Sequence, residues 1–170
     1  MTNKHKKRML DNVLLCVLML FSSYGFSQSS LPSDRYVIIP FQKILYCPLP
    51  ANSIPASLND SDYLIIDQVL SECIDQYNLA GANVRYEETN RKYPRQSFAI
   101  DLTRYYRQYM VAQNTKGEKE VWVNCLCTVQ YMESWRTHFV QVLGGGKCFF
   151  NLRINLTSKS YSDFQVNAPK

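Results

Sequence analysis

KCFFNLRINL, residues 147–156, alternates between two sets of side chains. One set is apolar and comprises Cys148, Phe150, Leu152, Ile154 and Leu156. The other set is mixed and comprises Phe149, Asn151, Arg153 and Asn155. Because successive side chains of a strand point to opposite faces, this pattern predicts a strand of an antiparallel sheet with one buried face.

Similar strand patterns lie on both sides of this segment. We expect four more strands, at residues 105–112, 120–128, 135–143 and 161–166. Turn-forming residues separate neighbouring strands at 114–117, 144–146 and 157–159. The carboxyl-terminal half is therefore predicted to be a run of strands linked by hairpins.

The clearest helix pattern precedes these strands. Residues 59–62 offer N-cap candidates and acidic side chains for a first turn. Apolar residues three and four positions apart then form one stripe: Tyr63, Ile66, Leu70, Cys73, Ile74 and Tyr77. Asn78 and Gly81 are stop signals, so we expect a helix over 61–78 and a loop over 82–98.

One helix followed by consecutive strands predicts an α+β fold for residues 59–170. In it, one main helix packs on a curved four- to five-stranded antiparallel sheet. This order resembles the cystatin-like and NTF2-like α+β rolls. Segments 117–125 and 144–167 are similar to a pattern met in uncharacterised small exported bacterial proteins. The resemblance covers roughly residues 60–167 and implies a fold and an export route, but no activity. Gln141–Gly144 is one residue short of the cystatin inhibitory loop.

The first 27 residues have the pattern of a secretory signal peptide. A cationic head at residues 4–8 precedes an apolar run at 13–21, and small residues near position 27 suit a peptidase. A membrane-spanning helix needs about 20 apolar residues, so we expect no membrane span after cleavage. The alternative is an amino-terminal helix that stays and packs on the domain. Residues 28–58, rich in Pro and Ser, predict an extended arm that could add an edge strand.

The predicted leader accounts for much of the positive charge. The whole chain has 19 Lys and Arg against 14 Asp and Glu, a formal net charge of +5. Residues 28–170 have 15 against 13, a net charge of +2. This near balance argues against nucleic acid as a partner. We expect an exported protein, periplasmic or extracellular.

Five cysteines follow the predicted leader: Cys47, Cys73, Cys125, Cys127 and Cys148. Cys73 falls on the apolar stripe of the helix, which predicts a buried thiol. Cys125 and Cys127 are either small core residues, or one of them bridges to Cys148; we take Cys127–Cys148 as the candidate disulfide. The Cys-x-Cys spacing lacks the matched pair of a zinc site, so we expect no metal.

The sequence names no catalytic residue and no cofactor. A cysteine nucleophile needs a histidine to activate it, and His138 is the sole histidine after the leader. We interpret His138 as an ordinary half-exposed residue of a strand. Asp163 is an isolated carboxylate. The three glycines at 144–146 lack the strand-to-helix setting of a phosphate loop and are better explained as a linker.

Aromatic, arginine and asparagine residues recur at alternate positions of two predicted strands. They are Tyr105, Arg107 and Tyr109 on one strand, and Phe149, Asn151, Arg153 and Asn155 on the other. Such a mixture on an exposed sheet face suits a protein, peptide or glycan ligand; the alternative is cross-strand pairs that only stabilise the sheet. We expect an exported non-enzymatic binding module. The alternatives are a small enzyme with an NTF2-like pocket, or an envelope accessory or structural protein.

Overall fold

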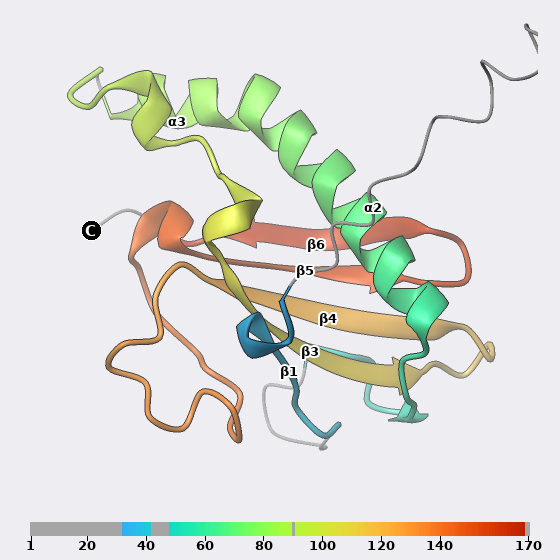
Figure 1. Cartoon of the computed structure of the whole chain (residues 1–170). Helices are drawn as coiled ribbons and strands as arrows, with labels where there is room; N and C mark the ends of the chain where they lie inside the picture. The colour runs from blue at the N-terminus through green and yellow to red at the C-terminus, as the bar shows by residue number, and fades with distance from the viewer. Residues whose placement is uncertain (1–31, 42–47, 90, 169–170) are drawn as a thin grey trace, which may run out of the picture. The chain divides into compact units, whose positions relative to one another are not determined.

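In the computed structural model, a long helix, α2 (Asp60–Gln76), lies across one face of a six-stranded mixed sheet (Figure 1). The structure describes residues 32–41, 48–89 and 91–168. The predicted signal peptide, residues 1–27, and Cys47 lie outside this part of the chain. The α+β class and the single main helix agree with the sequence prediction. The opposite face of the sheet is called the second face below.

Four consecutive strands form the antiparallel body of the sheet: β3 (Tyr106–Gln113), β4 (Lys119–Leu126), β5 (Phe149–Asn155) and β6 (Ser160–Val166). Two short strands from the predicted arm pair with β3: β1 (Tyr36–Ile38) runs parallel to it and β2 (Ile54–Pro55) antiparallel. The prediction of a purely antiparallel sheet is therefore wrong. A parallel pair needs a crossover connection, and the helical segment between β1 and β3 supplies it.

The helix begins as predicted but does not end there. A capping box between Asn59 and Asp62 starts α2, and a π-helical turn, η3 (Tyr77–Gly81), leads directly into α3 (Ala82–Glu88). The predicted loop over 82–98 is thus wrong in its first part. The Asn78 amide does not cap the helix; it exchanges two hydrogen bonds of 2.8 Å with the backbone of Ile100. Gly81 has helical dihedrals, and a Cβ there would lie 2.5 Å from the Tyr77 ring.

Short 3₁₀ turns complete the secondary structure: η2 (Ser33–Arg35), η4 (Arg95–Ser97), η5 (Leu102–Arg104) and η6 (Gly146–Cys148). In the described part of the chain, no helix is both long and apolar enough to cross a bilayer.

The main core lies between α2 and the sheet. Ile66, Leu70 and Cys73 of α2 are buried against Phe150, Leu152 and Ile154 of β5. The alternation predicted for residues 148–156 is confirmed, because these three β5 side chains are fully buried and their neighbours are half-buried on the second face.

A bulge interrupts the pairing of β6 with β5. One residue of β5 lies between Asn151 and Arg153, whereas two residues of β6 lie between their partners Gln165 and Ser162. The extra residue places Asp163 at φ 54°. As a result, Phe164 and Val166 pack on the core as Tyr161 does, although the spacing between Tyr161 and Phe164 is odd.

The predicted strand at 135–143 is wrong, because this segment belongs to a loop over residues 127–145 on the second face. Successive turns, such as Trp135 N–H to the Met132 carbonyl at 3.0 Å, shape its first half. Two buried amides of the sheet then hold the loop. Gln108 donates to the carbonyls of Trp135 and His138 at 2.5 and 2.8 Å, and Asn124 donates to the Val140 carbonyl at 2.8 Å.

Candidate functional site

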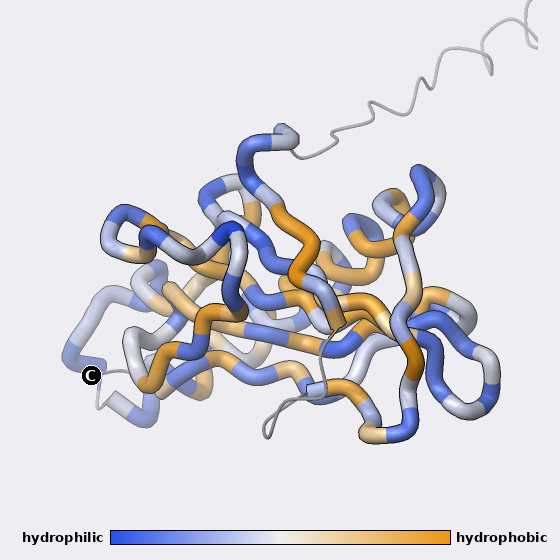
Figure 2. Tube along the Cα trace, turned by 90° about the horizontal axis from the view of Figure 1, so that it is seen from below, coloured by the Kyte–Doolittle hydropathy of each residue, from blue (hydrophilic) through white to orange (hydrophobic). Residues whose placement is uncertain are grey.

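The second face carries both polar and apolar side chains, among them Gln108 and Met110 of β3 and Trp122 and Asn124 of β4. Viewed from below, the side of the sheet away from α2, hydrophilic and hydrophobic segments alternate along the chain (Figure 2). Apolar residues of the arm cover one part of this face: Ile39 and Leu49 are buried against Met110 and Trp122. The end of loop 127–145 covers another part, and a pocket remains between this loop and the sheet.

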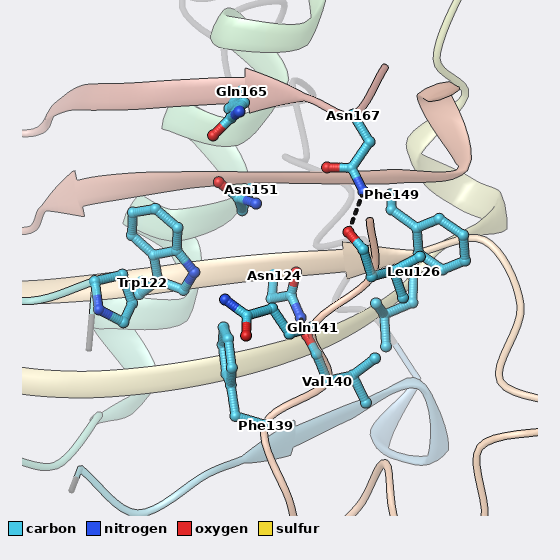
Figure 3. A pocket seen from close by; sticks show the side chains of 12 residues that line it. Trp122, Asn124, Leu126, Phe139, Val140, Gln141, Phe149, Asn151, Gln165 and Asn167 are labelled. Atoms are coloured by element: carbon cyan, nitrogen blue, oxygen red, sulfur yellow. Dashed lines mark hydrogen bonds between the residues drawn. The ribbon is translucent and has the colours of Figure 1, made fainter. Parts of the chain in front are cut away.

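The pocket has a volume of about 160 Å³. Amide side chains and apolar groups line it, and Figure 3 shows them from β4, β5, β6 and the loop. The lining consists of Pro48, Trp122, Asn124, Leu126, Phe139, Val140, Gln141, Val142, Phe149, Asn151, Gln165 and Asn167. These described lining residues carry no charged side chain.

Strand register aligns four amides across the sheet. Gln108 of β3 is paired with Asn124 of β4, Asn124 with Asn151 of β5, and Asn151 with Gln165 of β6. All four side chains lie on the second face, and we call them the amide row. A row of this kind runs perpendicular to the strands, because residues directly opposite each other share a face.

Two members of the amide row, Gln108 and Asn151, differ in their hydrogen bonds. The Gln108 carbonyl oxygen accepts from Asn124 Nδ2 at 3.1 Å and from Val140 N–H at 2.9 Å, and its nitrogen donates to two loop carbonyls. Gln108 is therefore saturated. In Asn151, the third member of the row, Oδ1 is buried and has no hydrogen-bond partner in the described part of the chain.

A second buried polar atom on the pocket wall is also unpaired. Trp122, which is 9 % exposed, has no acceptor for its indole N–H among the described residues. Figure 3 shows this nitrogen turned toward the amide side chains. Two residues of the lining, on adjacent strands, thus each carry a buried unpaired polar atom, a donor in Trp122 and an acceptor in Asn151. Three other buried atoms lack a hydrogen-bond partner among the described residues, and their residues do not line this pocket: Ser53 Oγ, Arg107 Nε and Glu120 Oε2.

The predicted β5 residues lie where the sequence places them, on the second face. Phe149 and Asn151 line the pocket. Arg153 lies beside it and binds Asp163 at 2.7 Å, with Glu120 further away at 3.9 Å. Asn155 has a structural contact, because its carbonyl oxygen accepts from Thr157 and Ser158 N–H at 3.0 Å and so holds the β5–β6 turn.

The predicted face for Tyr105, Arg107 and Tyr109 is wrong. The three residues share a face, as their spacing requires, but it is the face covered by α2, and they are only 3 %, 5 % and 2 % exposed. Each of the three side chains has a polar contact that offsets part of the cost of burial, although Arg107 Nε has no hydrogen-bond partner among the described residues. Arg107 binds Asp67 of α2 at 2.5 Å, Tyr109 lies 3.5 Å from Arg107, and Tyr105 donates to the Lys147 carbonyl at 2.7 Å.

A disulfide joins Cys127 to Cys148, the candidate pair from the sequence, with Cα atoms 4.8 Å apart. It closes loop 127–145 at its base. Cys73 and Cys125 are free and buried. Burial raises the pKa of the Cys125 thiol to about 12 and that of Cys73 to about 11. Neither thiol is therefore suited to act as a nucleophile near neutral pH.

The residues considered for catalysis are not brought together. His138 is exposed, its Nδ1 lies 2.9 Å from Thr137 Oγ1, and its ring does not line the pocket. Asp163 is exposed and paired with Arg153. No group of three His, Cys, Asp or Glu side chains able to hold a metal occurs among the residues that the structure describes.

Sequence reasoning missed the pocket residues outside β5: Trp122 and Asn124 of β4, Gln165 and Asn167 after the bulge, and the loop residues. A period-two pattern at Trp122, Asn124 and Leu126 was available. Nothing in the sequence showed that loop 127–145 folds back over these residues, since this depends on the tertiary contacts of Gln108 and Asn124.

Comparisons with known proteins give no assignment. No protein-family model, no curated protein and no solved structure shows a significant match to this chain.

Proposed function

We propose that this chain is an exported, non-enzymatic binding module whose ligand contacts the second face of the sheet. The observation that supports this most is the pair of buried, unpaired polar atoms on the pocket wall, Trp122 Nε1 and Asn151 Oδ1. An unpaired buried polar group costs about 1–3 kcal/mol. A ligand that pairs both atoms recovers this free energy on binding. The partner is a protein, a peptide or a glycan.

The position of the ionisable residues favours binding over catalysis. A small enzyme of the NTF2-like type would place an acid or a base inside its pocket, and neither His138 nor Asp163 lines the pocket. The arm is not wholly free to dock an envelope partner, since Ile39 and Leu49 are buried on the sheet. The binding role therefore has more support than either alternative.

Export and a roll-like fold complete the proposal. The leader pattern of residues 1–27 supports transport to the periplasm or the exterior. The Cys127–Cys148 disulfide suits an oxidising compartment. The order of α2 followed by four antiparallel strands supports a cystatin-like or NTF2-like roll.

Arrays of immobilised glycans and peptides test the binding role. The purified, fluorescently labelled protein should bind a subset of array positions, and Asn151→Ala should reduce these signals at least several-fold. Gln68→Ala, a change at an exposed amide on α2, is the matched control and should bind as the wild type does. Absence of binding on both arrays, or binding that Asn151→Ala leaves unchanged, would refute the proposal.

A further inference from the structure

The chemistry of the pocket narrows the ligand class. We propose that the pocket binds one uncharged sugar ring of a glycan, with hydroxyl groups paired to Trp122 and Asn151. This inference rests on the proposed function and names its ligand. It follows from hydrogen-bond polarity, charge, ring surfaces and size, taken in turn below.

The unpaired atoms require a ligand group that both donates and accepts. Trp122 Nε1 can only donate, and Asn151 Oδ1 can only accept. The nitrogens of Asn124 and Asn167 are already used to hold the loop: Asn167 Nδ2 donates to the carbonyls of Val142 and Gly144 at 2.6 and 2.9 Å. Their carbonyl oxygens add further acceptors. A hydroxyl supplies a donor and an acceptor on one atom, so neighbouring hydroxyls of a sugar can serve the wall.

The described lining carries no charged side chain, which disfavours ionic ligand groups. A carboxylate or phosphate would have only acceptors to offer and would face the oxygens of the asparagines. An ammonium group would leave the Trp122 N–H unpaired and would find no carboxylate among the described lining residues. The charged residues Arg153, Asp163 and Glu120 lie outside the lining, where Arg153 pairs with the two acids. A neutral ligand is therefore favoured.

Aromatic rings supply an apolar surface for the same ligand. Trp122, Phe139 and Phe149 line the pocket together with Leu126 and Val140 (Figure 3). None of the ring–ring contacts in the described part of the chain involves these three aromatic residues. A sugar ring has an apolar C–H surface as well as hydroxyls, and so matches a wall of rings and amides.

The volume sets the length of the bound segment. About 160 Å³ is roughly five times the ~30 Å³ that one water takes in the liquid, and it is smaller than the ~300 Å³ at which drug-sized sites begin. One ring-sized unit enters the pocket, and the rest of a glycan extends over the exposed rim at Gln141 and Gln165.

Titrations followed by NMR test the ligand class. The ¹⁵N-labelled full-length protein is titrated through the millimolar range with the methyl glycosides of glucose, galactose, mannose and N-acetylglucosamine. Parallel titrations use acetate, methylammonium and a blocked asparagine peptide. The Trp122 indole signal is assigned by its loss in Trp122→Phe, which keeps an aromatic ring. At least one glycoside should shift this signal saturably, and Asn151→Ala should weaken its binding about tenfold.

The amide spectra and melting temperatures of the variants show whether each variant still folds. Gln68→Ala, the matched control, should bind each glycoside as the wild type does. A peptide probe that shifts Trp122 when no glycoside does overturns the sugar assignment and leaves the binding module standing. A Trp122 signal that no probe moves also overturns it. Failure of the binding role itself would appear separately, as array binding that is absent or independent of Asn151.

Discussion

The loop that closes the pocket should depend on Gln108. Gln108 is 1 % exposed and makes four hydrogen bonds, to the carbonyls of Trp135 and His138, to Val140 N–H and to Asn124. Gln108→Leu keeps the approximate size of the side chain and removes all four. Each hydrogen bond contributes about 1 kcal/mol, and the freed loop groups recover part of this by hydrogen bonding to water. The free energy of unfolding should therefore fall by about 3 kcal/mol.

Urea unfolding measures this loss, and limited proteolysis with mass spectrometry measures whether loop 127–145 is cleaved faster. The matched control is Gln113→Leu in the same strand, where the half-buried amide makes one bond, to the Gly117 carbonyl at 2.8 Å. Its expected cost is below about 1 kcal/mol. If Gln108→Leu costs no more than this control and the loop remains protected, Gln108 does not anchor the loop.

Three further predictions concern ion pairing and cysteine chemistry. Asp67→Ala should lower the free energy of unfolding by about 2 kcal/mol, because it leaves the buried Arg107 charge unpaired. Adding Arg107→Met should recover most of this loss in a double-mutant cycle measured by urea unfolding. Equal losses in the single and the double variant would contradict this. Replacing Cys127 and Cys148 together by serine should cost about 3 kcal/mol, and an unchanged thermal midpoint would count against that. Since burial raises the pKa of Cys125 to about 12, iodoacetamide at pH 8 should label this thiol only after unfolding, as mass spectrometry can check.

The parts of the fold that local pattern could predict are those with one buried face. The alternation in β5 and the apolar stripe of α2 each determine which side chains enter the core. β3 has no such signal, because positions 107–112 are buried on both faces. Period two could group Tyr105, Arg107 and Tyr109, but it could not say which face α2 covers. The sequence pattern placed Arg107 on an exposed face, because its ion-pair partner, Asp67, is 40 residues away and no local pattern links the two.

A small part of the candidate site was within reach of the sequence for the same reason. Phe149 and Asn151 follow from the β5 alternation. Trp122 and Gln165 become pocket residues only through the pairing of three strands and the closing of loop 127–145. Gly81 was mispredicted for a different reason. Glycine often marks the end of a helix, but here the helix continues and the Tyr77 ring packs against the backbone at Gly81, where a side chain would not fit.

The bulge in β6 affects whether the sheets of two molecules can associate through their edges. Among the strands that the structure describes, β6 pairs only with β5, so its outer side is a sheet edge where a strand from another molecule could add. At Asp163, with φ 54°, the regular spacing of outward N–H and C=O groups is broken midway. A strand from another molecule could form hydrogen bonds with only a few of these groups on either side of the break. The bulge therefore disfavours edge-to-edge addition of strands and growth into fibrils.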